Sequence, residues 1–580
     1  MTLNDMILRS IDRYAELPAL KIRRGEVFEP ITYRELGEII SRLGTALIDL
    51  GVRTGTRVGL ISDNRYEWIM CDLAVLGTGA CDVPRGSDTT ARELAYILEH
   101  AEIELAFVED RGQLDKVYAI GESLPRLKTL IVMSDEEELD PDRYRGVGVH
   151  RMDELVRRGA ELLEGGDGRF RRAALSVGED DLATIIYTSG TTGLPKGVML
   201  SHGNIMHNVV NAPKNVPITT GDRFLSILPA WHSFERTVEY VLLYVGASNA
   251  YSKPTAQVLL KDFETEKPHY ITSVPRIWES LYNAIQYKVG RESRARRALF
   301  RFFVSVGKLH HRAVMTRRGL MPSYAPRGVL QKAAGKLRAG LAAALLHPLA
   351  AAGDVLVYRK IRARTGGELK AGISGGGALS SNVDEFFAGI RLRVLEGYGL
   401  TETSPIVSVR TFQRPVPYTV GPLLEQVEVK IVDDNGRRLG PGETGIIMVR
   451  GPLVMKGYYR DEETTRAVLS PDGWLNTGDL GRLTLDGELQ ITGRAKDTIV
   501  LSGGENIEPL PLEQKLGESA YIAQAMIVGQ DRKTPGALIV PEFEKLEEFA
   551  RHSGLSFSGR EGLIQLQEIR SLYRQEIKRL

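Results

Sequence analysis

The 580-residue sequence has little cysteine, no excess of charge of one sign and no long uninterrupted apolar run. Its two cysteines, Cys71 and Cys81, are too few for a disulfide framework in a chain of this length, and their spacing does not match a metal-ligand motif. Lysine and arginine number 75 against 74 aspartates and glutamates, so the overall charge indicates no nucleic-acid partner. These shortages favour a reduced, cytoplasmic, multidomain protein.

The sequence also lacks a secretory signal and a segment expected to cross a membrane. Its start, MTLNDMILRS, contains Asp5 and has no apolar run. No stretch approaches the ~20 uninterrupted apolar residues that span a bilayer. The apolar stretch 341–352 is too short by this measure and contains Pro348.

Helices and strands alternate over residues 31–110. Apolar spacing predicts helices over 32–50 and 66–77, the first capped by Thr32 and Glu35, and strands over 57–61 and 105–108. This alternation predicts an α/β fold with parallel sheets. Beyond residue 426 the strands become antiparallel in pattern, which indicates a small β-barrel-like part. We expect a large domain over 1–492, a hinge at 493–496 and a small mobile α+β domain over 497–580.

Residues 291–340 are strongly basic, with thirteen lysines and arginines and a single acid, Glu292. Apolar residues such as Phe302 and Phe303 interleave with the basic ones. Two interpretations remain open: contact of 291–352 with an anionic membrane surface, or a solvated basic helix face.

The segment YTSGTTGLPKG (187–197) follows from the predicted strand 183–187 and contains three glycines, the hydroxyl residues Ser189, Thr191 and Thr192, and Lys196. Glycines let a backbone approach a phosphate, hydroxyl and N–H groups donate hydrogen bonds to it, and lysine adds a positive charge. The segment differs from the common nucleotide-triphosphatase loop because Gly197 follows Lys196 where that loop has serine or threonine. It predicts a site for the β- and γ-phosphates of ATP.

The same segment resembles the signature of the adenylate-forming superfamily, which includes acyl-CoA synthetases, luciferases and nonribosomal adenylation domains. Further motifs of that superfamily follow in order. GISGGGA (372–378) resembles its adenine-edge loop and YGLTETS (398–404) its adenine and magnesium segment. WLNTGD (474–479) resembles the ribose segment, GRAKD (493–497) the hinge, and SGGEN (502–506) the loop that closes on the pantetheine channel.

The resemblance implies a set of functional residues. Those expected to bind the nucleotide are Thr188, Ser189, Gly190, Thr191, Thr192, Gly193, Lys196, Ser374, Gly375, Gly376, Gly377, Glu396, Gly397, Tyr398, Gly399, Thr401, Asp479 and Arg494. Those expected to act in catalysis are Lys196, His232, Thr401, Glu402 and the hinge lysine Lys496. Thr191 and Glu402 are the expected Mg²⁺ ligands.

The pattern Gly372-x-Ser374-x-Gly376 also fits the nucleophile elbow of hydrolases. The one histidine downstream, His552, falls in a different predicted domain. We therefore interpret Ser374 as a residue of a binding loop.

Within the superfamily, WHSFER (231–236), SVPRIWE (273–279) and LEGYGLTE (395–402) resemble long-chain fatty acyl-CoA synthetases. This implies ATP-dependent activation of a long-chain fatty acid to its adenylate, then transfer to coenzyme A. Alternatives are a fatty acyl-AMP ligase that loads a carrier protein, an aryl-acid ligase, and a non-catalytic acyl-nucleotide binder. A luciferase-type oxygenase and a membrane structural protein fit the motifs less well.

One feature departs from the resemblance. The superfamily carries an adenylation lysine near its C-terminus, whereas the predicted small domain has only Lys515, Lys533, Lys545 and Lys578, none in the expected context. Residues 537–540 are predicted to form a strand, and Lys578 lies at the end of an amphipathic helix. We expect the small domain to be incomplete and adenylation by this chain to be slow.

Overall fold

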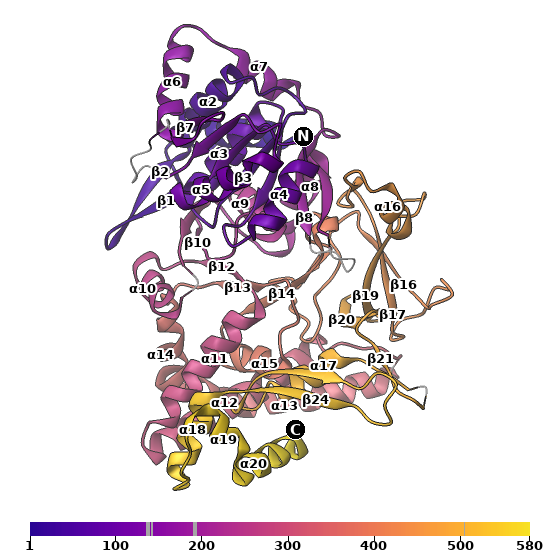
Figure 1. Cartoon of the computed structure of the whole chain (residues 1–580). Helices are drawn as coiled ribbons and strands as arrows, with labels where there is room; N and C mark the ends of the chain where they lie inside the picture. Colours follow the sequence, from indigo (N-terminus) through magenta and orange to yellow (C-terminus); the bar gives the residue numbers. More distant parts are fainter. Residues whose placement is uncertain (135–139, 141–142, 189–193, 254, 327, 504) are drawn as a thin grey trace.

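Two eight-stranded sheets form the large domain of the computed structural model, which describes all residues except 135–139, 141–142, 189–193, 254, 327 and 504 (Figure 1). The predicted helix 32–50 is confirmed as α2 (Tyr33–Asp49), with the Thr32 and Glu35 capping box in place. The predicted strands 57–61 and 105–108 are β3 and β5, and the predicted helix 66–77 is α3. The α/β fold class with parallel sheets is therefore confirmed.

The sheet that carries the phosphate-loop strands is parallel except at one edge, where β9 and β18 run antiparallel to their neighbours. In sheet order its strands are β18 (Gly457–Tyr458), β9 (Lys196–Ser201), β8 (Leu182–Thr188), β4 (Cys81–Arg85), β3 (Arg57–Ile61), β5 (Leu105–Val108), β6 (Thr129–Val132) and β7 (Gly148–Arg151).

The other large sheet is parallel at its centre and antiparallel at both edges. Its strands in order are β15 (Ser408–Val409), β14 (Val394–Tyr398), β13 (Ala371–Ser374), β12 (Tyr270–Ser273), β10 (Arg223–Ser226), β11 (Ser248–Tyr251), β1 (Pro18–Arg24) and β2 (Val27–Thr32). The carboxyl ends of β13 and β14 meet at one edge, which brings two of the predicted nucleotide motifs together.

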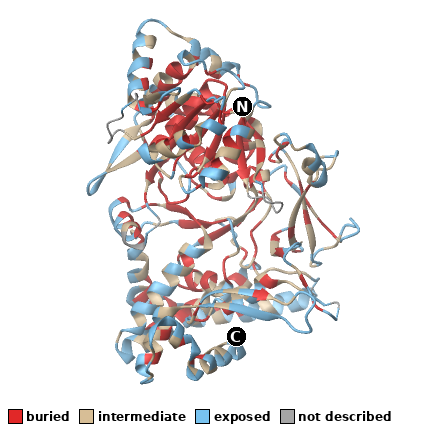
Figure 2. Cartoon of the chain, viewed as in Figure 1, coloured by how far each residue is buried: buried red, intermediate tan, exposed pale blue. Residues whose placement is uncertain are grey.

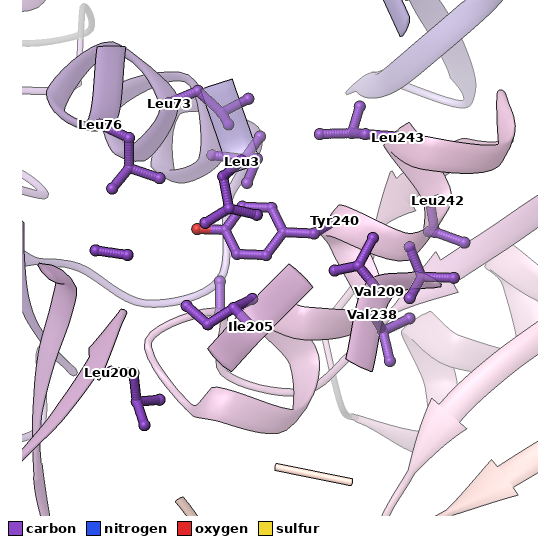
Figure 3. Packing of buried hydrophobic residues seen from close by; sticks show 14 of the residues in the cluster. Leu3, Leu73, Leu76, Leu200, Ile205, Val209, Val238, Tyr240, Leu242 and Leu243 are labelled. Carbon is purple, nitrogen blue, oxygen red and sulfur yellow. The ribbon is translucent and has the colours of Figure 1, made fainter. Parts of the chain in front are cut away.

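Helices pack around these sheets. In chain order they are α1 (Leu3–Tyr14), α2, α3 (Tyr66–Gly77), α4 (Ala91–His100), α5 (Arg111–Ala119), α6 (Met152–Glu164), α7 (Arg169–Ser176), α8 (His202–Asn215), α9 (Ser233–Val245), α10 (Ala256–Glu266), α11 (Pro275–Gly290), α12 (Arg294–Arg318), α13 (Val329–Gly353), α14 (Arg359–Arg362) and α15 (Ser381–Gly389). Burial is densest where α1, α3, α8 and α9 meet, and there Tyr240 packs among Leu3, Val209 and Leu243 (Figures 2 and 3).

A buried ion-pair network joins the two sheets through α9. The guanidinium of Arg236 donates to Asp82 of β4 at 2.9 Å and also to Asp72 of α3, and Tyr240 donates to Asp72 at 2.6 Å. All four side chains are almost completely buried. The single guanidinium compensates the carboxylate of Asp82, while burial raises the pKa of Asp72 well above its ordinary value.

The predicted antiparallel part after residue 426 is a four-stranded sheet at the side of the large domain (Figure 1). Its strands in order are β16 (Glu428–Val432), β17 (Gly445–Arg450), β19 (Leu475–Leu483) and β20 (Leu489–Arg494), and α16 (Glu462–Val468) precedes β19. β19, which sequence analysis did not predict, carries most of the WLNTGD motif between β17 and β20.

The C-terminal part is α+β. It contains the hairpins β21 (Ile499–Val500) with β22 (Asn506–Ile507) and β23 (Ile522–Val528) with β24 (Gly536–Pro541), and the helices α17 (Pro509–Leu516), α18 (Phe543–His552), α19 (Gly559–Gln565) and α20 (Gln567–Arg579). The predicted strand 537–540 and the helix ending near Lys578 are both confirmed. Contacts between this part and the large domain include the hydrogen bond from Gln514 to the Ala378 carbonyl at 3.3 Å and the approach of Lys545 to within 3.8 Å of the Tyr287 ring centre.

The apolar stretch 341–352 belongs to a longer helical run. The stretch 341–352 is part of α13, and helical backbone continues through Val329–Thr365 despite Pro348. Among the described residues this is the one helix long and apolar enough to cross a membrane by length and composition, with 22% of its apolar window buried. The expectation that no segment crosses a membrane rested on uninterrupted apolar runs, whereas a helix tolerates isolated polar residues within such a window, and it stays a prediction.

Candidate functional site

The phosphate-loop segment connects two paired strands at the edge of a sheet. β8 and β9 are antiparallel, with Thr188 opposite Lys196 and Tyr187 opposite Gly197. Lys196 therefore opens β9 directly at the end of the loop, and Thr188 closes β8 on the other side. Ser189, Gly190, Thr191, Thr192 and Gly193 lie outside the described residues, so their predicted phosphate contacts and the predicted metal role of Thr191 stay predictions.

Tyr458 brings Lys196 and Glu402 together. Its two-residue strand β18 pairs with β9, Tyr458 opposite Val198. The Tyr458 hydroxyl donates to Glu402 at 2.9 Å, and the Lys196 ammonium lies 5.6 Å from the centre of the Tyr458 ring. Burial raises the pKa of Tyr458, and the Glu402 carboxylate raises it further, so the phenol stays protonated and acts as a donor.

Sequence analysis missed Tyr458 because no local pattern links it to a loop more than 250 residues upstream. Its signal is weak: an aromatic residue in the sequence KGYYR (456–460), after the antiparallel strands.

The ribose-type motif forms a compact hydrogen-bonded group. Tyr398 donates to Oδ2 of Asp479 at 2.7 Å, and Arg494 donates through Nε to Oδ1 at 3.0 Å. Asp479 and Arg494 face each other on β19 and β20. Asp479 is only 4% exposed, while the Arg494 side chain is 65% exposed. Burial raises the pKa of Asp479, against the opposing effects of Tyr398 and Arg494. A carboxylate has about four acceptor positions, so Asp479 retains capacity for hydroxyl donors.

The glycine loop after β13 packs closely against neighbouring segments. The Gly375 amide donates to the Ser273 carbonyl at 3.0 Å, and a Cβ on Gly375 would lie 3.1 Å from the Phe234 ring. Gly376 has φ +73°, a conformation that side chains disfavour, and Gly377 follows it beside Pro275. The turn therefore needs glycine for both conformation and space.

Ser374 at the end of β13 is fully buried, and its hydroxyl has no hydrogen-bond partner among the described residues. His552 lies on α18, where its ring hydrogen-bonds the Glu548 carbonyl. A buried hydroxyl at the end of a strand does not fit an exposed nucleophile, and the predicted role of Ser374 in a nucleotide-binding loop stays a prediction.

Glu396 and Gly399 contact the protein segments that surround the site. The Glu396 carboxylate accepts from the Leu379 amide at 3.0 Å and pairs with Arg410, which also contacts Asp384. Burial raises the pKa of Glu396 to about 7, although Arg410 opposes the shift. Gly399 has no room for a side chain, because a Cβ there would lie 1.5 Å from the Pro405 carbonyl oxygen. Gly397 belongs to β14, opposite Val409 of β15.

Thr401 and His232 approach the site from different elements. Thr401 is buried and accepts a long hydrogen bond, 3.5 Å, from Ser233 at the start of α9. His232 precedes that helix, with its ring 5.5 Å from the Trp231 ring. The His232 side chain is exposed to solvent at one side. The protein packed around the ring partly desolvates it, and this desolvation and the nearby Arg85 guanidinium both lower the pKa of His232. The imidazole is therefore neutral at neutral pH.

Lys496 lies in the exposed turn between β20 and β21, where the Asp497 amide donates to the Arg494 carbonyl at 3.0 Å. This turn joins the four-stranded sheet to the C-terminal part. The predicted pivot role of Lys496 is compatible with that position and stays a prediction.

The fold and these motifs define an AMP-binding enzyme. The sequence pattern of the AMP-binding enzyme family matches residues 8–459, and that of the AMP-binding enzyme C-terminal domain matches residues 496–554. The chain belongs to this family.

Two curated relatives cover most of the chain. The long-chain-fatty-acid–[acyl-carrier-protein] ligase AEE15, chloroplastic, of Arabidopsis thaliana is 37% identical over 560 residues, 94% of this chain and 76% of that protein. The long-chain-fatty-acid–CoA ligase FadD15 of Mycobacterium tuberculosis is 32% identical over 523 residues, 90% of this chain and 79% of that protein.

Among solved structures, the anthranilate CoA ligase AuaEII in complex with anthranoyl-AMP superimposes with a TM-score of 0.71 at 18% identity. The match covers 100% of this chain and 90% of that one. At this identity the likeness is one of fold.

Proposed function

We propose that this protein is an acid–thiol ligase that activates a long-chain fatty acid with ATP and transfers the acyl group to a thiol. The observation that carries the proposal is the convergence of Lys196 and Glu402 on Tyr458, at the exit of the glycine-rich loop. A lysine beside a phosphate loop and a carboxylate suited to a hard cation are the groups that a triphosphate requires. The two curated relatives, one with a carrier-protein acceptor and one with coenzyme A, support the substrate class.

In the first step a carboxylate oxygen of the fatty acid attacks the α-phosphorus of ATP, and the bond to pyrophosphate breaks. Lys196 neutralises charge on the phosphates, and Thr401 donates to the α-phosphate. Asp479 accepts hydrogen bonds from the ribose hydroxyls, while Tyr398 holds the Asp479 carboxylate in place. In the second step the thiol sulfur attacks the acyl carbonyl, the thiol proton is lost, and AMP leaves.

Glu402 suits a magnesium ion by its donor chemistry. Among the described residues there is no group of three or more histidine, cysteine or acidic side chains that could hold a metal alone. Mg²⁺ is commonly bound through one or two carboxylates together with substrate phosphates, and the partly exposed Glu402 offers such a carboxylate. Thr191 is the second proposed ligand. When bound, the ion supplies charge neutralisation at the phosphates.

The small domain completes the cycle by turning at the hinge 493–496, with Lys496 as the pivot and residues 502–506 facing the thiol substrate. His232, neutral at neutral pH, stands beside the acyl group. Cys71 and Cys81 are buried free thiols, which supports a reducing, cytoplasmic setting.

Pyrophosphate release from ATP tests the first step, with fatty acids of increasing chain length as substrates. Thioester formation with coenzyme A, compared with that on an acyl carrier protein, then identifies the acceptor. We expect Lys196→Ala to abolish pyrophosphate release, while Lys214→Ala, at a surface pair with Glu425, keeps it. Absence of pyrophosphate release and of bound acyl-adenylate with every fatty acid would overturn the proposal.

A further inference from the structure

One face of α13 carries a row of exposed leucines. Leu337 is 68% exposed, Leu341 60%, Leu345 78% and Leu349 41%. With 3.6 residues per turn, leucines four apart advance about 40° each, so all four lie within a sector of about 120°. We call these four residues the leucine face. They extend along about 18 Å of helix axis.

The opposite face of α13 is fixed against the protein. Ala339, Ala343, Ala350 and Gly353 are buried on that side, where α13 packs on α12. Just beyond the helix, the Tyr358 hydroxyl donates to the Phe303 carbonyl at 2.5 Å. Because the opposite side of α13 packs on α12, the leucine face points away from the core.

The charge around the leucine face is positive. Exposed Arg338 stands at its N-terminal end, and exposed Arg359 and Lys360 follow its C-terminal end. Over 329–365 the one acid is Asp354, which pairs with Arg362 at 2.8 Å. A partner that covers this face must accept aliphatic side chains at its centre and offer negative charge at both ends.

We propose that the leucine face docks the protein on an anionic lipid bilayer, with α13 parallel to the membrane plane. Leucines flanked by lysine and arginine are the composition of helices that lie in the interface, where acyl chains take up the leucines and anionic headgroups attract the basic residues. Protein interfaces are instead enriched in tyrosine and tryptophan, which the leucine face lacks. α13 lies on the bilayer and does not cross it, because α12 occupies its other side.

Vesicle sedimentation with the full chain tests the proposal. We expect the protein to sediment with phosphatidylcholine vesicles that contain phosphatidylglycerol, and less with pure phosphatidylcholine or at high salt. The double variant Leu341→Ser/Leu345→Ser should bind at least about tenfold more weakly, because two aliphatic contacts are lost. The control is Leu538→Ser, a leucine on β24 with 62% exposure that should leave vesicle binding unchanged.

A second pair of variants separates charge from apolar contact. Arg338→Glu/Arg359→Glu should weaken binding to the anionic vesicles, whereas Arg437→Glu, at an exposed turn, should not. Thermal unfolding of all variants should match that of the unmodified chain, since the replaced side chains are exposed.

Several results would overturn the proposal: no sedimentation of the unmodified chain, equal binding by the leucine variant, or a lipid-free dimer that the leucine variant dissociates. A dimer of that kind would assign the leucine face to a second copy of the chain. Vesicle binding is measured without ATP or fatty acid, so its outcome is independent of the proposed ligase reaction.

Discussion

Arg236 of α9 donates to Asp82 of β4 at 2.9 Å in the fully buried interior, and this ion pair fastens one large sheet to the helix layer of the other. The same guanidinium contacts Asp72. The geometry of the nucleotide site depends on this connection, because α9 begins at Ser233, which contacts Thr401.

Replacement of Arg236 by methionine should destabilise the protein by about 3–5 kcal/mol, because the buried carboxyl groups of Asp72 and Asp82 lose their cation. Urea unfolding measures the change. The control is Arg34→Met, at an exposed pair with Glu16, where the expected loss is about 0–1 kcal/mol. Equal effects of the two substitutions would contradict a structural role for the buried network.

Glu402→Gln should lower the rate of pyrophosphate release about 10²-fold, because the neutral amide no longer offers a charged oxygen at the phosphates. The amide can still accept from Tyr458, so stability should change little. Glu428→Gln, at an exposed pair with Arg450, is the control and should keep the full rate. A Glu402→Gln variant with unchanged kcat would exclude a role for this carboxylate in the reaction.

Glu235 should make stability depend on pH. Burial raises the pKa of Glu235 from its ordinary 4.5 to about 7, while hydrogen bonds from Ser226 and Thr272 oppose the shift. Between these values the native state holds a proton that the unfolded chain releases, so stability falls as pH rises through the window. The loss contributed by Glu235 is about 3 kcal/mol.

Urea unfolding between pH 4.5 and 8 checks this expectation. Glu235→Gln should flatten the decline, since an amide does not titrate. Glu38→Gln, which removes a half-exposed carboxylate on α2, should follow the unmodified curve. If the Glu235→Gln and unmodified curves run parallel, the buried carboxyl is not the source of the dependence.

Gly399→Ala should destabilise the chain by at least about 3 kcal/mol and abolish ATP binding, because the new Cβ would overlap the Pro405 carbonyl oxygen. Calorimetric titration with ATP and urea unfolding give the two readouts. At Gly290 an added Cβ meets nothing within 4 Å, so Gly290→Ala should be neutral in both.

Pyrophosphate release by the 580-residue chain should be about 10²–10³-fold slower than that of the Mycobacterium tuberculosis relative. Lys515 and Lys545 in the small domain pair with Glu518 and Glu548, and Lys533 and Lys578 are on exposed surface. Rates within a few-fold of each other would show that the expected adenylation lysine is not needed.

Local sequence predicted those elements whose signal is local. The strand 57–61 is uncharged and buried after its first residue, Arg57, and the helix at 33–49 has both its cap and its apolar spacing within one segment. β19 was missed because its sequence, LNTGDLGRL, mixes glycine and polar residues, and its strand conformation depends on β17 and β20. The helical run through Pro348 was missed for the opposite reason, since a local helix breaker is overridden by packing on α12.

The candidate site divides in the same way. The motifs at 187–197, 398–404 and 474–479 could be read along the chain, and the structure brings Tyr398, Asp479 and Arg494 into direct contact. Tyr458 and Arg410 could not be identified from the sequence, because their partners are distant along the chain and no periodicity connects them. The structure adds that Glu396 forms a buried ion pair with Arg410.

The two-residue strand β18 sets an order of events during synthesis. The ribosome completes β8, β9 and the phosphate loop long before Tyr458 is made, and N-terminal segments fold first as the chain emerges. Until β18 joins the sheet edge, β9 lacks its outer neighbour and Lys196 and Glu402 lack their shared tyrosine. We therefore expect a nascent chain to complete this site only after Tyr458, and with it most of the large domain, has left the ribosome.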